Sequence, residues 1–172
     1  MYDRILVPVD GSPTSDHGLQ EAIRIAKLTK GRLRLMHVID ELSLIYAGNQ
    51  LSSMPTLRED AARLLDNDKR IAEAEGLEAE TVLKDIFKGR VHELILTEAR
   101  NWPADLIVLG THGRRGIDRL TMGSSAENIL RTASVPVLLV RAPEGAAEGE
   151  AEPAAERKLV RADLPSGALS SE

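Results

Sequence analysis

Residues 105–113 read Asp-Leu-Ile-Val-Leu-Gly-Thr-His-Gly, an apolar run that passes directly into a segment containing glycine. The run is short, and its apolar residues do not alternate with polar ones, which indicates a strand buried on both faces. Strands of this kind occur in parallel sheets whose two faces are covered by helices. We therefore expect an α/β fold built around a parallel sheet.

Similar apolar runs recur on both sides of this strand, at residues 5–9, 33–39, 79–83 and 135–140. Between the runs, apolar residues recur at helical spacing in segments that end before Gly31, before Gly76, near residue 99 and near residue 133. Ser12 or Ser15 is expected to cap the first helix, and residues 40–56 predict a loop. Right-handed crossovers then predict an open, doubly wound, five-stranded parallel sheet with helices on both faces.

Composition divides the chain into a folded part, residues 1–141, and a tail, residues 142–172, rich in alanine, glycine, proline and glutamate. Of the net charge of -5, the tail carries -4, from seven acidic and three basic residues. The nearly neutral folded part has no field that attracts DNA or anionic membrane, and 2% aromatic residues supply no base-stacking surface. We expect no nucleic-acid or membrane partner.

The chain contains no cysteine, which excludes disulfides and thiolate chemistry. Its first residues enter an apolar run without the pattern of a signal peptide, and no run approaches the roughly 20 residues that span a bilayer. Both observations predict a cytoplasmic protein. Pro136, inside the last apolar run, has no N–H group and favours the edge of the sheet or the start of the strand.

The segment after residue 109 has the properties of a phosphate-binding loop. Gly110, Gly113 and Gly116 permit positive φ and close approach of a ligand to the backbone. Gly123-Ser124-Ser125 then opens a helix, whose first N–H groups and dipole favour phosphate. Four arginines against two acids between residues 110 and 131 add a local positive charge. The alternative interpretation is that these glycines and serines are ordinary turn and cap residues.

A second special segment, Pro8-Val9-Asp10-Gly11-Ser12, follows the first strand. In open α/β sheets the ligand lies beyond the carboxyl ends of the strands, where the strand order reverses. If the strands ending near residues 9 and 109 are neighbours, both special segments face one crevice. Asp10 on its own would more often be a turn residue or the cap of the following helix, and its place beside the crevice favours a functional role. His37 is expected to be a packed or edge residue.

Several nucleotide-binding and catalytic motifs are absent from the sequence. It has no Gly-x4-Gly-Lys-Ser/Thr, no Gly-x-Gly-x-x-Gly after a strand and no Gly-x-Ser-x-Gly. A phospho-acceptor receiver domain needs clustered acids after the first strand, where Asp10 stands without an adjacent acid. The four histidines show no metal-ligand spacing.

Three segments together resemble the universal stress protein family, over residues 1–141. They are the opening 5–12, the run 105–113, and Gly123-Ser124-Ser125-Ala126-Glu127 with the final strand 135–140. The ATP-binding branch of that family carries Gly-x2-Gly-x9-Gly-Ser/Thr, which this chain matches at Gly110, Gly113, Gly123 and Ser124. The resemblance implies a Rossmann-like fold of the adenine nucleotide alpha hydrolase type.

The resemblance also implies the parts of a binding site for ATP or a related adenine nucleotide, with or without magnesium. Asp10 would contact the ribose or a metal, and the Val38 backbone would meet the adenine. The other implied contacts are Pro8 and Val9 beside the adenosine, Gly110 and Gly113 against ribose and phosphate, and Gly123, Ser124 and Ser125 on the phosphates. His112 lies in the same loop and is a candidate ligand contact or proton donor on its chemistry alone; the alternative is a solvated loop histidine. Family members pair through the last strand, so Val135 to Val140 is the expected homodimer edge.

Three functions stay open at this point. The first is a homodimeric stress-response module that binds ATP and acts by regulation or signalling. The second is a slow ATP hydrolase or phosphate-transfer enzyme, for which the sequence offers no committed base or nucleophile. The third is a nucleotide-free dimer that acts through protein contacts. The residues favour binding of ATP over its consumption.

Overall fold

The computed structural model describes residues 1–41, 54–87, 89–111 and 122–141, and the structural statements below concern these residues. The elements, in chain order, are β1 (Arg4–Pro8), α1 (Pro13–Thr29), β2 (Arg32–Asp40), α3 (Met54–Ala74), β3 (Ala79–Ile86), α4 (Val91–Asn101), β4 (Leu106–Gly110), α5 (Ser124–Thr132) and β5 (Val137–Val140). All strand pairs are parallel, and the sheet order is β3-β2-β1-β4-β5. The predicted open, doubly wound α/β fold is confirmed.

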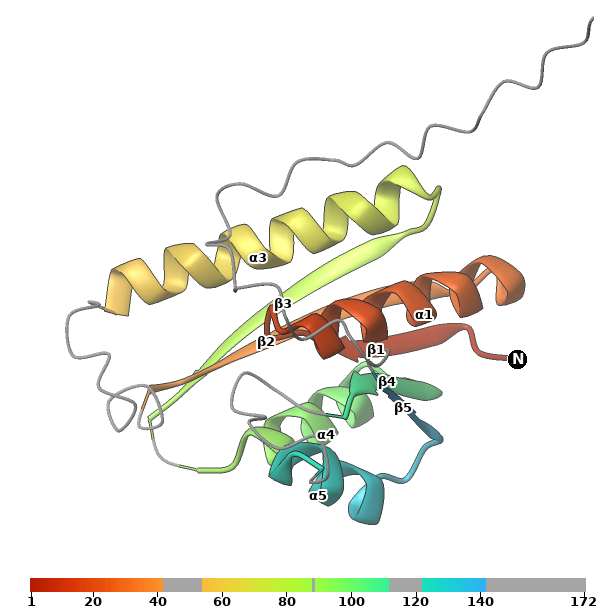
Figure 1. The fold of residues 1–172 in the computed structure, drawn as a ribbon. Helices are drawn as coiled ribbons and strands as arrows, with labels where there is room; N and C mark the ends of the chain where they lie inside the picture. Colours follow the sequence, from red (N-terminus) through yellow and green to blue (C-terminus); the bar gives the residue numbers. More distant parts are fainter. Residues whose placement is uncertain (42–53, 88, 112–121, 142–172) are drawn as a thin grey trace, which may run out of the picture.

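Helices cover both faces of the sheet, with α1 and α3 on one face and α4 and α5 on the other (Figure 1). Alternate residues of β1 serve the two faces. Ile5 and Val7 belong to the core under α1 and α3, and Leu6 belongs to the core under α4 and α5. This double coverage explains why the strands read as continuous apolar runs.

The two edge strands differ from their predicted bounds. β3 continues to Ile86, beyond the predicted end at residue 83, and pairs with β2 as far as Asp40. Its last residues include exposed, charged Lys84 and Asp85, so hydrophobicity could not reveal them. β5 begins after Pro136, whose carbonyl accepts a bond from the Ile107 N–H (3.0 Å). The proline thus precedes the strand at the edge of the sheet, where its missing N–H costs nothing.

The two ends of α1 show which of the predicted cap residues act as caps. Ser12 is the N-cap, because its hydroxyl accepts a bond from the Ser15 N–H (3.2 Å). At the other end the helix stops before Gly31, as predicted, but it is Lys30 that adopts the left-handed conformation (φ 57°). Gly31 is required for a different reason, since a Cβ there would lie 2.5 Å from the Tyr2 carbonyl oxygen.

An ion-pair group ties the amino end of β2 to β3 and α4. The Arg34 guanidinium contacts carboxylates of Glu98 (2.6 Å) and Glu80 (2.5 Å) and lies 4.6 Å above the centroid of the Trp102 ring. Trp102 is buried at the end of α4. Among the helices in the described ranges, none is long and apolar enough to cross a bilayer.

Candidate functional site

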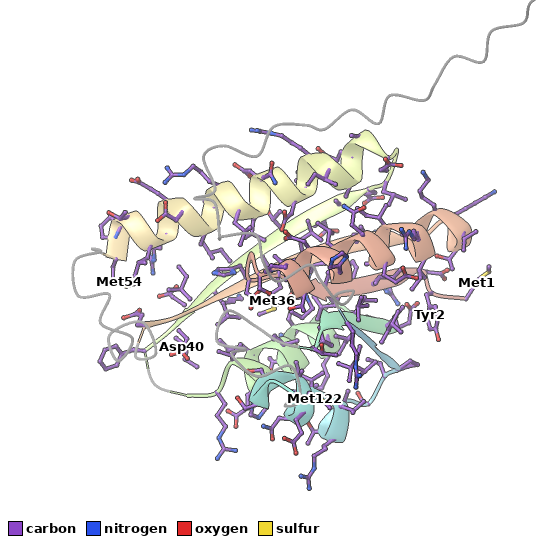
Figure 2. The ribbon with its side chains drawn as sticks, viewed as in Figure 1. Met1, Tyr2, Met36, Asp40, Met54 and Met122 are labelled. Carbon is purple, nitrogen blue, oxygen red and sulfur yellow. The ribbon has the colours of Figure 1, made fainter. Side chains whose placement is uncertain are left out.

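The reversal of strand order lies between β1 and β4. β1 pairs with β2 on one side and with β4 on the other, through Ile5 opposite Leu106 and Leu6 opposite Ile107. The condition set by the sequence is therefore met, and the segments after β1 and β4 leave from neighbouring carboxyl ends. Met36 and Asp40, labelled in Figure 2, mark the second half of β2, beside which β1 ends.

Beyond the end of β1 the backbone is held from two sides. The Val9 N–H donates to the Met36 carbonyl of β2 (2.8 Å), and the Asp10 N–H donates to the Ser15 hydroxyl of α1 (3.1 Å). The Asp10 carboxylate accepts from the Ser12 N–H (2.9 Å), which makes it the turn residue that its sequence position suggested. The same bond fixes this carboxylate beside the crevice, so the turn role and a ligand role are compatible.

The backbone of Val38 points to the same end of the sheet, beyond the last residue of β1. Each residue of a parallel strand directs its N–H and C=O to one side, and successive residues alternate. Leu33 donates its N–H toward β3, whereas the carbonyl of Met36 accepts from Val9 at the end of β1. Val38 follows Met36 by two residues, so its N–H and C=O point to the side of β1, past the point where that strand ends.

Gly110, the last residue of β4, is a glycine because α1 approaches it closely. A Cβ at this position would lie 2.7 Å from the carbonyl carbon and oxygen of Thr14 and 3.0 Å from the Ser15 nitrogen. Gly18 packs on the same contact from the helix side, where a Cβ would lie 3.3 Å from the Gly110 nitrogen. The positive φ expected of the glycines in this segment does not occur at Gly110. Helix packing therefore explains this glycine.

Two hydrogen bonds join the end of β4 to the start of α5. Thr111 is buried and donates its N–H to the Val140 carbonyl of β5, and its own carbonyl accepts from the Gly123 N–H (both 2.9 Å). Gly110 thus lies near Gly123, Ser124 and Ser125, the other residues of the Gly-x2-Gly-x9-Gly-Ser/Thr pattern that the structure describes. Gly113, which the motif also assigns to the site, lies outside the described residues, as do the candidate contact His112 and Gly116.

The first turn of α5 begins at this junction with unpaired backbone donors of the kind found at every helix start. Gly123 is the N-cap and supplies no side-chain cap, while Glu127 donates to its carbonyl. The N–H groups of Ser124, Ser125 and Ala126 are those that an α-helix cannot satisfy internally. A helix start of this kind, at the positive end of the helix dipole, suits an anion such as phosphate.

One of the bases expected around the site lies elsewhere. Arg131 is in the last turn of α5 and pairs with Glu127 (3.5 Å), on exposed helix surface. Arg131 was counted among the positive charges of the phosphate loop because it lies only a few residues after Ser124 and Ser125 in the chain. The helix carries it roughly 10 Å away from the first turn, at about 1.5 Å per residue. The remaining predicted bases lie between residues 112 and 121, outside the described residues.

His37 is a residue of this region whose contact the sequence did not reveal. It is buried (6% exposed), as a packed residue should be, and its Nδ1 lies 2.6 Å from the Val9 carbonyl oxygen. A buried histidine needs a hydrogen-bond partner, so its presence inside an apolar strand could have indicated such a contact. Periodicity cannot show that the ring reaches across to the end of the neighbouring strand.

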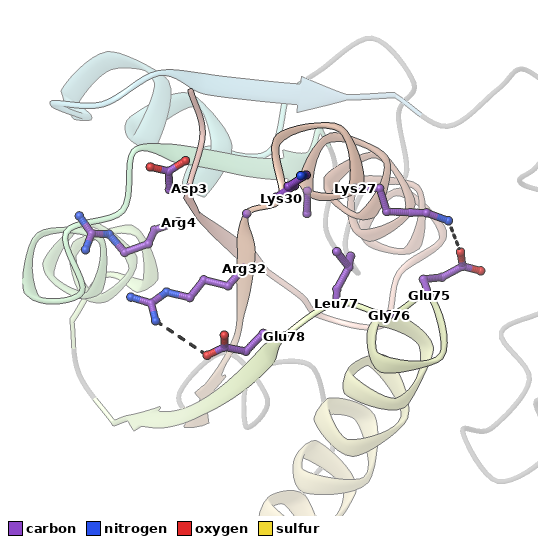
Figure 3. A pocket seen from close by; sticks show the side chains of 11 residues that line it. Asp3, Arg4, Lys27, Lys30, Arg32, Glu75, Gly76, Leu77 and Glu78 are labelled. Carbon is purple, nitrogen blue, oxygen red and sulfur yellow. Dashed lines mark hydrogen bonds and ion pairs between the residues drawn. The ribbon is translucent and has the colours of Figure 1, made fainter.

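A surface cavity of about 670 Å³ lies at the opposite, amino end of the sheet (Figure 3). It is bounded by the end of α1, the turn before β3 and the starts of β1 and β2. Two ion pairs lie in its lining, Lys27 with Glu75 (2.6 Å) and Arg32 with Glu78 (3.8 Å). Neither special segment of the sequence lies there, so chemistry places the candidate site at the carboxyl end instead.

Comparisons with known proteins agree with this geometry. The universal stress protein family matches residues 1–141. One universal stress protein of Methanocaldococcus jannaschii is 32% identical over 147 residues, covering 84% of this chain and 85% of the relative. A second protein of that organism is 30% identical over 160 residues, covering 82% of this chain and 96% of the relative.

Solved structures show the same fold. The structure of a protein first described as hypothetical, MJ0577, has a TM-score of 0.71 at 30% identity, covering 83% of this chain and 97% of that one. A universal stress protein from Archaeoglobus fulgidus, solved in complex with dAMP, has a TM-score of 0.61 at 24% identity, covering 81% and 98%. The family match and these relatives, taken with the residues above, identify the chain as a member of the universal stress protein family.

Proposed function

We propose that this protein binds an adenine nucleotide, with ATP as the favoured ligand, at the carboxyl ends of β1 and β4. The bond between Thr111 and Gly123 carries the proposal, because it brings the glycine at the end of β4 to the uncapped first turn of α5. Phosphates would bind the N–H groups of Ser124 and Ser125 and the glycine segment that includes Gly113 and His112.

The adenosine would lie across the ends of β1 and β2. Pro8 and Val9 would line it, Asp10 would contact the ribose or a magnesium ion, and Val38 would offer its backbone to the adenine. The direction of the Val38 N–H and C=O supports this arrangement, since the pair faces the crevice beyond β1. Family members whose solved structures hold dAMP and cAMP share the fold at 24% identity.

The protein acts, in this proposal, as a regulatory or signalling module in the stress response, and as a homodimer through β5. An apolar edge strand is a liability unless another chain covers it, and β5 consists of Val-Leu-Leu-Val. Nucleotide occupancy would alter the shape or the partners of the dimer.

Binding is tested by denaturing the purified protein, identifying any released nucleotide by mass spectrometry, and titrating ATP by calorimetry with and without magnesium. We expect an adenine nucleotide or a measurable heat of binding. Neither signal under any of these conditions would reject the proposal. Steady release of phosphate above an enzyme-free blank would favour a slow ATP hydrolase instead.

A matched pair of variants tests the phosphate contact. Ser124→Pro deletes one N–H at the first position of α5, where proline is tolerated, and Gly123 already has the conformation that precedes proline (φ -59°, ψ 139°). Ser124→Ala deletes the hydroxyl alone. We expect Ser124→Pro to lower ATP affinity by about tenfold and Ser124→Ala by less, because a phosphate–amide bond is worth roughly 1–2 kcal/mol. Equal affinity of Ser124→Pro and the wild type would place the phosphates elsewhere.

A further inference from the structure

The Val9 carbonyl accepts its hydrogen bond from a side chain. Its oxygen lies 2.6 Å from Nδ1 of His37, and a carbonyl oxygen only accepts, so Nδ1 carries the hydrogen atom. The ring is 6% exposed and comes from β2, next to the residue whose backbone faces the crevice. His37 therefore joins the two strand ends at the candidate site.

A regular parallel ladder would use this carbonyl differently. In such a ladder, a residue opposite position j of the neighbouring strand donates its N–H to the carbonyl of residue j-1. Its own carbonyl accepts from the N–H of residue j+1. Val9 already donates to the carbonyl of Met36 (2.8 Å), so its own carbonyl should accept from the Val38 N–H. The ladder stops one step earlier, at Pro8 opposite Met36, and the His37 ring stands in place of the Val38 donor.

We propose that His37 is a positioning residue that sets base specificity, because it occupies the Val9 carbonyl and leaves the Val38 N–H for the nucleotide base. This inference rests on the proposed function. The N–H and C=O of one residue complement adenine, which presents the acceptor N1 beside the amino group on C6. Guanine presents the opposite order, a donor at N1 beside a carbonyl oxygen. Its N1–H would therefore face the Val38 N–H, and its carbonyl oxygen would face the Val38 carbonyl.

Removing the imidazole should therefore change selectivity as well as affinity. In His37→Leu the Val9 carbonyl loses its donor and recovers the regular partner, the Val38 N–H, which is then no longer available to the base. We expect ATP affinity to fall by about tenfold, the loss of one hydrogen bond, while GTP affinity stays nearly constant. The ratio of ATP to GTP affinity should then fall by about tenfold.

Two variants separate this role from packing. His37→Asn keeps an N–H near the position of Nδ1 and should restore most of the ATP preference. Leu35→Ala, two residues earlier on the same buried face, should lower stability and leave the ratio unchanged. Calorimetric titrations of all four proteins with ATP and GTP give the comparison. A wild-type ratio in His37→Leu, measured while the wild type binds ATP, would overturn the inference and spare the proposed function.

Amide hydrogen exchange gives a second measurement that needs no ligand. The Val38 amide should exchange faster than the Met36 amide in the free wild type and become protected when ATP is added. In His37→Leu, or in His37→Phe if the leucine variant does not fold, it should be protected without ATP. Slow exchange of Val38 in the free wild type would overturn the inference, and absence of ATP binding would instead reject the proposed function.

Discussion

The two edges of the sheet are built differently. β3 pairs with β2 along its whole length, from Ala79 to Ile86, and carries exposed Thr81, Lys84 and Asp85. β5 has half that length, Val137–Val140, and its apolar side chains are all half-buried. Charged residues protect a free edge from pairing with other chains, whereas an apolar edge invites it. Of the two edges, β5 is therefore the one to which the proposed homodimer is assigned.

The backbone directions sharpen this comparison. Val140 accepts from Thr111, so its backbone faces inward, and Leu139 directs its N–H and C=O to the open edge. On β3, Glu78 accepts from Leu33, so by the same alternation Thr81 faces outward. Proline at either outward position removes a donor that the sheet itself does not use.

The largest effect is expected from Leu139→Pro. A symmetric dimer contains the substitution twice, so two edge hydrogen bonds and the strand geometry around them are lost. We expect the dimer dissociation constant to rise by roughly a thousandfold, or about 4 kcal/mol. Sedimentation velocity over a range of concentrations measures it.

Thr81→Pro is the matched control and should leave the oligomeric mass unchanged. Circular dichroism checks that both variants stay folded. Dissociation by Thr81→Pro, or an intact dimer in folded Leu139→Pro, would assign the interface to the wrong edge.

A smaller effect is expected on the β3 side, where ion pairs hold the elements together. Arg34→Leu leaves the Glu98 carboxylate, only 11% exposed, without its partner. We expect the free energy of unfolding to fall by about 3 kcal/mol, because an unpaired and largely buried charge is costly. Urea denaturation measures the change. Adding Glu98→Leu should recover most of the loss, and no recovery would mean that Arg34 acts through its stacking on Trp102.

The smallest of the three effects concerns the β4–β5 side, which depends on close packing. Gly110→Ala places a methyl group against the backbone of α1, and we expect a loss of about 2 kcal/mol in the free energy of unfolding. Gly18→Ala meets the same contact more loosely and gains helix propensity, so it should stay within about 1 kcal/mol of the wild type. Equal losses in the two urea curves would contradict this account of Gly110.

The sequence predicted what depends on patterns along the chain. The apolar run at 105–109 and its counterparts predicted the strands, and the helical spacings between them predicted the helices. Because β1 and β4 are neighbours, Asp10 and Gly110 lie at the same end of the sheet. The end of β3 escaped prediction because an edge strand tolerates charged residues such as Lys84 and Asp85. Local hydrophobicity does not record which strand lies at the edge.

Reasons for individual residues were harder to predict than their positions. Gly110 was expected to act through conformational freedom and Gly31 to mark a helix end, yet both also avoid clashes with segments distant in sequence. His37 was expected to be packed, and its bond to Val9 depends on where a neighbouring strand stops. Such contacts arise from the tertiary arrangement, and patterns along a single sequence do not reveal which distant segments meet.

The position of Trp102 has a practical consequence for spectroscopy. It is the sole tryptophan of the chain, buried beside Arg34 at the amino end of the sheet, opposite the candidate site. Its fluorescence should therefore change when the domain unfolds and stay constant during a nucleotide titration. A new tryptophan close to the crevice would be needed for an optical binding assay, with the native indole as its built-in reference.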